Sequence, residues 1–439
     1  MARTRRDRGW SMIGLHTPKL DVHDHHGRRY RVGEQPRELA GRPRGVLLWA
    51  CWLPMLLAGT MQYAFGAAIP ALTAAGHDLG WLCATLACWT VFQAGAGYPV
   101  AHLRQRDRLD PRTVLIGGGI LCAAGVLTLG HVQSPPGLLL GYSVLGGTGA
   151  GLVYAVCTST AQKWFPESPA TRVGFVTGAF AYGSAPFVLA LAASGQPREI
   201  ALFAPVLLVA VTGCGLLLTD PPRDWWPAHV DHRSWARANP PAAHEFSATE
   251  ALRTPALPAM AACLFCAATV SLFNAVFLAL LAGPWAAALF VATNGAGRAL
   301  AMPLATRFGR RRVLRRVVAV QAAGQVLLLL ALTHASHSWL LTGATVAGIG
   351  GGAFYPILAA LARELFGQRR SAEVHGLIYS AKAASGVVGI GFGFLVLAQQ
   401  GPALALLVAT LLSLAAAAVC GLFRRPGLPK TLPSPRTGT

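Results

Sequence analysis

The chain contains twelve apolar runs, each close to the ~20 residues that a helix needs to cross a bilayer. In the hydrocarbon core every backbone N–H and C=O must be paired within the chain, so runs of this length predict membrane-spanning helices. The predicted spans are 46–69, 81–101, 113–132, 136–160, 172–194, 200–219, 255–281, 285–305, 313–333, 338–362, 374–398 and 402–423. Between 255 and 305 the apolar sequence is nearly continuous, and Gly283-Pro284 supplies the predicted turn. The expected fold class is an all-α membrane protein with twelve transmembrane helices.

Composition excludes an ordinary soluble protein. Hydrophobic residues make up 54% of the chain and charged residues 12%, whereas soluble domains carry about 25% charged residues. The formal net charge of +20 would suit nucleic acid if the basic residues formed one patch. They lie instead in short loops between apolar runs, which is typical of membrane proteins. We therefore expect a lipid bilayer around the spans and no nucleic-acid partner.

The distribution of basic residues predicts the orientation of the chain. Thirty-four of the 37 lysines and arginines fall in the termini and in every second loop, so these segments are predicted to face the cytoplasm. We expect a multi-pass protein of the inner (plasma) membrane with both termini cytoplasmic. The predicted organisation is a basic tail without fixed structure at 1–45, a six-helix bundle at 46–219, a linker at 220–254, a second six-helix bundle at 255–423 and a tail at 424–439.

The two halves resemble each other at an offset of 201 residues. Gly147, Gly149, Gly151, Tyr154 and Phe165 fall on Gly348, Gly350, Gly352, Tyr355 and Phe366. A repeat of six helices in the same orientation predicts two bundles with the binding site between them. The glycines are predicted to let neighbouring helices pack closely.

Arg298 and Lys382 are the two cations predicted to lie deep in the membrane. Arg298 is nine residues before Arg307 at one helix end, and Lys382 is nine residues after Glu373 at another. At 1.5 Å per residue, both lie about 13–14 Å deep in a core about 30 Å thick. No acidic residue or histidine falls at this depth, and an unpaired cation there is costly. The pair therefore predicts a binding site for a small carboxylate anion, which arginine can hold with two parallel hydrogen bonds.

Four tyrosines also fall inside predicted helices, where each hydroxyl needs a polar partner. They are Tyr63, Tyr154, Tyr355 and Tyr379. They either line the same cavity as the two cations or pack within the bundles, and the sequence leaves both interpretations open.

The cysteines do not predict a metal site or disulfides. All nine lie inside apolar runs. Cys263 and Cys266 have CxxC spacing, but no second pair or histidine accompanies them, so they are interpreted as buried apolar residues. The histidines between positions 16 and 26 lie in the polar tail and are not interpreted as ligands either. We expect no metal and no cofactor.

Three groups of motifs stand in the predicted helices and loops. They are Lys163-Trp164-Phe165-Pro166 with Gly174, Gly178 and Tyr182-Gly183-Ser184, then Asn294-Gly295-Ala296-Gly297-Arg298 with Arg307-Phe308-Gly309-Arg310-Arg311, and Tyr379-Ser380-Ala381-Lys382. With these motifs the chain resembles the major facilitator superfamily over nearly the whole of 46–423, and most closely its oxalate–formate antiporter and monocarboxylate porter group. In that group the arginine and lysine are the substrate-binding pair. The sequence departs from the family pattern at Met302 and Thr306, where a small residue and an aspartate are usual.

The sequence therefore favours a secondary transporter of small organic anions that works by alternating access, as an exchanger and as a monomer. Proton coupling is the alternative mode, with Lys382 giving up its proton when the site is empty. Proton-driven efflux of another metabolite or a drug is less favoured, because it usually needs an acidic residue in the membrane. A membrane-embedded enzyme or sensor is also less favoured, since no catalytic group, ATP-binding motif or large soluble domain is found.

Overall fold

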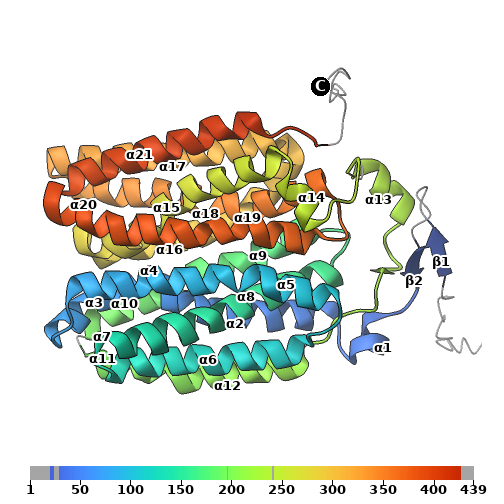
Figure 1. Cartoon of the computed structure of the whole chain (residues 1–439), viewed down its shortest axis with the longest axis horizontal. Coiled ribbons are helices and arrows are strands. Elements are labelled where there is room, and N and C mark those ends of the chain that lie inside the picture. The colour runs from blue at the N-terminus through green and yellow to red at the C-terminus, as the bar shows by residue number, and fades with distance from the viewer. Residues whose placement is uncertain (1–19, 24–28, 195, 240–241, 427–439) are drawn as a thin grey trace, which may run out of the picture.

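The computed structural model describes residues 20–23, 29–194, 196–239 and 242–426. Two helical bundles lie side by side with their long axes in the same general direction (Figure 1). The chain enters the first bundle and leaves the second at the same end, which we call the terminal side, and the opposite end is the far side (Figure 1).

The first bundle is built from six helical spans, most of them divided into shorter helices. Its elements are α2 (Arg44–Tyr63), α3 (Phe65–Ala74), α4 (Leu79–Gly95), α5 (Gly97–Gln105), α6 (Pro111–His131), α7 (Pro135–Leu138), the π-helix η1 (Leu139–Gly146), α8 (Gly147–Trp164), α9 (Pro169–Tyr182), α10 (Ala185–Ser194), α11 (Pro197–Ala201) and α12 (Phe203–Leu217). Two of the short breaks fall at glycines, Gly95 and Gly97 between α4 and α5 and Gly183 between α9 and α10, and glycine weakens a helix.

The second bundle has longer and more continuous helices. Its elements are α15 (Ala256–Leu281), α16 (Gly283–Phe308), α17 (Arg310–His334), α18 (His337–Phe366), α19 (Ser371–Gly386), the π-helix η2 (Val387–Phe392), α20 (Gly393–Gln400), α21 (Pro402–Val419) and the 3-10 turn η3 (Cys420–Leu422). The turn predicted at Gly283 is confirmed. Its φ of 83° is a left-handed conformation that favours glycine.

Eleven helical stretches in the described residues are long and apolar enough to cross a membrane, which confirms an all-α membrane fold. The predicted span 285–305 lies within α16, which is 26 residues long. It is not among the eleven, because Asn294 and Arg298 near its middle lower its hydropathy.

The first span bends at Ala64, where α2 ends and α3 begins. The hydroxyl of Tyr142 on η1 donates a hydrogen bond to the carbonyl of Met61 beside this break. An interrupted helix inside a membrane needs such a partner for its backbone. The break immediately follows Gln62 and Tyr63, so these two side chains sit where α2 changes direction.

A small three-stranded sheet lies outside the bundles on the terminal side. Strand β1 (Leu20–His23) is antiparallel to β2 (Arg29–Val32), and β2 is parallel to β3 (Trp225–Trp226) in the linker. The short helices α1 (Pro36–Ala40), α13 (His232–Ala238) and α14 (Ala248–Leu252) lie on the same side (Figure 1). The structure thus differs from the expected tail without fixed structure at 20–23 and 29–45, because β2 pairs with the linker. The rest of that tail lies outside the described residues.

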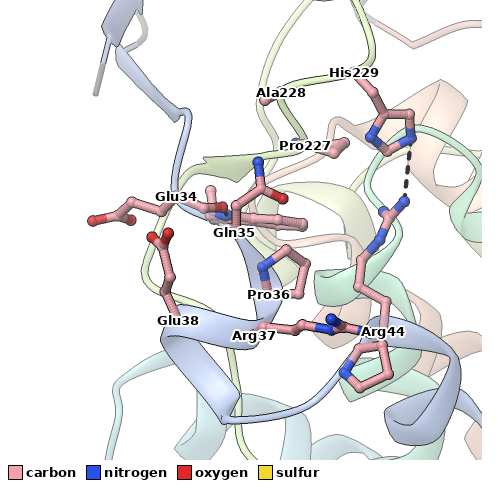
Figure 2. A pocket seen from close by; sticks show the side chains of 11 residues that line it. Glu34, Gln35, Pro36, Arg37, Glu38, Arg44, Pro227, Ala228 and His229 are labelled. Atoms are coloured by element: carbon pink, nitrogen blue, oxygen red, sulfur yellow. Dashed lines mark hydrogen bonds between the residues drawn. The ribbon is translucent and has the colours of Figure 1, made fainter. Parts of the chain in front are cut away.

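The segment before α2 also docks on the linker, since Nε1 of Trp225 donates to the carbonyl of Glu34 at 3.0 Å. Arg44, the first residue of α2, donates to Glu167 of the α8–α9 loop at 2.8 Å and lies 3.3 Å from Nε2 of His229 in the linker. A cavity of about 690 Å³ separates this segment from the linker. Figure 2 shows Arg44 and His229 on one side of this cavity and Glu34 and Glu38 on the other.

Asp220 ties the start of the linker to the first bundle. Its carboxylate accepts two hydrogen bonds from Arg104 of α5, at 2.7 and 2.8 Å, and one from Lys163 of α8 at 2.5 Å. The second half of the linker contacts the second bundle instead, since the N–H of Phe246 donates to the carbonyl of Phe366 at 2.9 Å. Each half of the linker is therefore anchored to a different bundle.

Glycines allow close helix contacts, as the sequence predicts. A Cβ on Gly147 would lie 2.7 Å from the carbonyl oxygen of Trp89, and one on Gly350 would lie 2.3 Å from the backbone nitrogen of Gln321. Real Cβ atoms do not approach this closely, so α8 and α18 pack backbone against backbone with their neighbours.

The two bundles approach each other closely along α9 and α16. A Cβ on Gly178 would lie 2.8 Å from the carbonyl oxygen of Gly295, and one on Gly174 would lie 2.7 Å from that of Arg298. This crossing therefore brings the backbone of α9 against the helix that carries Arg298.

Candidate functional site

Arg298 lies near the middle of α16, and only 2% of the residue is exposed. Its Nε donates to Oδ1 of Asn294 at 3.2 Å, one turn earlier on the same helix. Its terminal nitrogens donate to the hydroxyl of Tyr63 at 2.5 Å and to the carbonyl of Thr177 at 3.1 Å, both in the first bundle. The guanidinium carbon lies 4.5 Å from the ring centre of Tyr355, within the range of a cation–π contact.

Lys382 lies on α19 and is equally buried. Its ammonium donates to Oε1 of Gln62 and to Oε1 of Gln93, each at 2.7 Å, and to the hydroxyl of Tyr379 at 3.3 Å. These contacts use all three N–H groups of the ammonium. Gln62 belongs to α2 and Gln93 to α4, so Lys382, like Arg298, bonds to the first bundle across the interface.

The four predicted tyrosines join the two cations into one cluster. Tyr154 stacks on Tyr379 with ring centres 4.9 Å apart, and Tyr355 lies 6.1 Å from Tyr379. Tyr355 and Tyr63 contact Arg298, while Tyr379 contacts Lys382. All six residues that the sequence singles out are therefore neighbours, and their role in binding stays a prediction.

The interface is closed on both sides of this cluster. On the terminal side, Nδ1 of His102 on α5 lies 2.8 Å from Oε1 of Glu373 on α19. On the far side, a Cβ on Gly66 of α3 would lie 2.3 Å from the carbonyl oxygen of Val276 on α15. Both cations are buried, because these helices meet above and below them.

The charge of the cluster is not balanced within the described part of the chain. No ion pair there includes Arg298 or Lys382, and the ion pairs that occur all lie outside the cluster. The hydrogen-bond partners of Arg298 and Lys382 are amide, hydroxyl and carbonyl groups, which carry no net charge. Burial of charge without a counter-ion is unfavourable, so the cluster has the electrostatics of an anion site.

Several donors in the cluster have no acceptor among the described residues. The contacts of Arg298 account for three of the five N–H groups of a guanidinium, which leaves one on each terminal nitrogen. The Nε2 amide of Gln62 and the hydroxyl of Tyr355 are likewise buried without a partner. A carboxylate is the acceptor that arginine N–H groups bind most strongly.

Sequence reasoning missed Gln62, Gln93 and Asn294 as members of the cluster. Each is a polar amide inside an apolar run, and each is at most 1% exposed. Such amides are a usable signal, because a buried amide needs partners. Asn294 also stands four residues before Arg298, which places both side chains on one face of the helix.

Comparison with known proteins identifies the fold. A family model described as the Major Facilitator Superfamily matches residues 51–283 and 281–438. The chain belongs to the Major Facilitator Superfamily. Membership in this superfamily, together with the apolar helices, makes the chain a multi-pass membrane transporter and not an enzyme.

Three proteins similar to this chain are described in different ways. A protein of Thermoproteus tenax, described as an uncharacterized 38 kDa protein in the 23S RNA operon, is 30% identical over 77% of this chain and 83% of its own length. The oxalate:formate antiporter of Oxalobacter formigenes is 36% identical over 22% of this chain and 21% of its own length. A triacylglyceride transporter of Mycobacteroides abscessus is 35% identical over 23% of this chain and 20% of its own length.

Proposed function

We propose that this superfamily member carries small carboxylate anions across the plasma membrane by alternating access, as an exchanger and as a monomer. The observation that carries the proposal is the pair of buried cations, Arg298 and Lys382, held only by neutral groups. The partial similarity to an oxalate:formate antiporter supports the same class of substrate.

The charge of the site gives a physical reason for exchange. Closing the bundles around two positive charges is unfavourable when nothing cancels them, because charge is costly in a dry interior. A dianion such as oxalate cancels both charges, and a monoanion such as formate cancels one. Reorientation of the bundles is therefore easier with a carboxylate bound than without one. Export of one anion is for this reason coupled to import of another.

The terminal side is proposed to face the cytoplasm. The terminal segments and the loops on that side hold thirty-four of the 37 basic residues, which is the distribution expected for cytoplasmic segments. Fusing a reporter that is fluorescent only in the cytoplasm to the C-terminus tests the orientation, and a fusion that stays dark while an extracellular reporter is active would contradict it.

The test of function is uptake of labelled oxalate by liposomes that contain the purified protein and unlabelled oxalate or formate. Saturable uptake that requires the internal anion is expected. Arg298→Gln and Lys382→Gln remove one charged hydrogen-bond donor each, worth about 1.5–3 kcal/mol, or roughly 10- to 150-fold in apparent affinity. Arg316→Gln is the matched control, since Arg316 is exposed on α17, and it should transport normally.

The outcomes separate the alternatives. Absence of oxalate uptake by protein that remains folded would refute the oxalate proposal, and uptake of a monocarboxylate driven by a pH gradient would favour proton coupling. If the three glutamine variants were equally active, the two buried cations would not be the binding pair.

A further inference from the structure

A second cavity lies within the first bundle, away from the cationic cluster. It has a volume of about 240 Å³ and is lined by α2, α3, α6, η1, α10, α11 and α12. Its lining is mostly apolar and includes Met61, Tyr142, Phe187, Leu191 and Phe203. The lining residues come from the middle and the far-side ends of their spans, so the cavity occupies the far-side half of the bundle.

The cavity has a buried end and an exposed rim. Met61 and Tyr142 at the buried end are 4% and 1% exposed. Ala190 and Glu199 at the rim are exposed. Next to the rim residue Phe203, Leu202 between α11 and α12 and Val206 of α12 form a strongly exposed apolar surface. In a membrane transporter such a surface meets lipid, so the cavity opens toward the bilayer.

Glu199 of α11 lines the rim, and Arg198 is its neighbour in the same helix. Both are exposed, and neither forms an ion pair with another described residue. An arginine pairs well with a phosphate, and a carboxylate pairs with an ammonium. Neighbouring charges of opposite sign therefore match a headgroup that carries both a phosphate and a primary amine.

We propose that this cavity binds one acyl chain of a far-side-leaflet phosphatidylethanolamine, with the phosphate at Arg198 and the amine at Glu199. An empty apolar cavity forfeits dispersion contacts, and a chain from the adjoining bilayer restores them. At about 30 Å³ per group of water size, the volume accommodates roughly eight such groups, a stretch of acyl chain rather than a whole lipid.

The cavity also touches the bend at Ala64, beside the candidate site. Met61 lines it, and the next two residues, Gln62 and Tyr63, contact Lys382 and Arg298. The carbonyl of Met61 accepts the hydrogen bond from Tyr142, which lines the cavity too. A bound acyl chain would thus support the bend at Ala64. We therefore expect this lipid to affect the rate of transport, and this expectation rests on the proposed function.

Photolabelling tests binding independently of transport. The protein would be reconstituted in vesicles of phosphatidylglycerol with either phosphatidylethanolamine or phosphatidylcholine, each carrying a diazirine on one acyl chain close to the headgroup. Label is expected to concentrate on residues 187–203, with about fivefold more from the ethanolamine lipid. Even labelling of all lipid-facing helices would overturn the proposal, and equal labelling by the two lipids would overturn the headgroup assignment.

Substitutions at the rim sharpen the test without disturbing the core. Ala190→Phe places a ring at the mouth and should reduce labelling of 187–203 severalfold, while Glu199→Gln should abolish the preference for ethanolamine. Ile120→Phe is the control, because Ile120 is an exposed apolar residue on α6 outside the cavity. Labelling unchanged in A190F would refute the site. Labelling as expected together with lipid-independent exchange would keep the site and refute only its link to transport.

Discussion

Replacing Gly178 by alanine tests whether the close crossing of α9 and α16 belongs to the transport cycle. The added Cβ would lie 2.8 Å from the carbonyl oxygen of Gly295, whereas ordinary contacts begin at 3.4 Å. The two helices belong to different bundles. The substitution therefore requires them to separate by about 0.6 Å, the difference between these distances, at one turn from Arg298.

The expected cost falls on the closed form alone. Overpacking a tight contact costs about 1–3 kcal/mol, and 1.4 kcal/mol is tenfold in an equilibrium, so the closed population should fall roughly 5- to 150-fold. This clash is absent when the bundles are apart at this point. Those conformations also gain the ~1 kcal/mol by which alanine is more favourable than glycine within a helix. Gly178→Ala should therefore lose transport while keeping its folded stability.

Uptake in proteoliposomes and thermal unfolding in detergent measure the two quantities on one preparation. Gly213→Ala is the matched control, since a Cβ on Gly213 would meet nothing within 4 Å. The control should transport normally and unfold at an equal or slightly higher temperature. Wild-type uptake by G178A would refute the reasoning, because the clash would then be absorbed without consequence. If G178A lost thermal stability but kept its transport activity, the close crossing would stabilise the fold without taking part in the transport cycle.

Two further predictions concern the terminal side. Burial raises the pKa of Asp220, but the charges and hydrogen bonds of Arg104 and Lys163 together outweigh it and hold the pKa below its usual range. Asp220→Asn should lower the free energy of unfolding, measured with denaturant, by about 3 kcal/mol, because Arg104 stays buried without its counter-ion. Asp107→Asn, which breaks an exposed pair with Arg223, should lower it by under about 0.5 kcal/mol. Equal losses in the two variants would contradict this. The stabilisation is present above the unfolded-state pKa and lost as pH falls through the folded-state pKa, so the D220N deficit should shrink in acid. Glu373→Ala removes the part-buried contact with His102, worth ~1 kcal/mol, and should speed amide hydrogen exchange in α5 (97–105) about fivefold. Unchanged exchange would show that this contact does not keep the terminal side closed.

The membrane-spanning architecture was predictable because its cause is local. Length and apolarity of each run decide whether a helix can span, and a left-handed glycine decides where α15 turns into α16. The bend at Ala64 had no such signal, since no proline or glycine occupies that position. It depends on the hydroxyl of Tyr142, which reaches Met61 from a helix 81 residues away in sequence.

The sheet on the terminal side was missed for a similar reason. Strand β2 pairs with β3, so Arg31 lies beside Trp225, and the two residues are far apart in the sequence. A two-residue strand has no periodicity to detect, and the tail around it is rich in charged residues, which are typical of disorder. Only the tertiary contact reveals the order of this segment.

For the candidate site, the sequence indicated the charges but not their partners. Arg298 and Lys382 were conspicuous because charge in a membrane span is costly. Gln62 and Gln93 were not, since an isolated amide in an apolar run can also satisfy itself within its own helix. That both amides turn toward Lys382 depends on how the two bundles meet, a property that no single span carries.

The neutral partners of the two cations argue for a ligand more strongly than their depth does. Both cations belong to the second bundle, yet Lys382 bonds to Gln62 and Gln93, and Arg298 bonds to Tyr63, all in the first bundle. A structural ion pair would have used a carboxylate, whose attraction would resist separation of the bundles. Amides and hydroxyls satisfy the N–H donors more weakly and leave the charge uncancelled. A carboxylate can therefore compete for the same donors, and replacing these cross-bundle bonds is the step by which an anion would change the balance between open and closed forms.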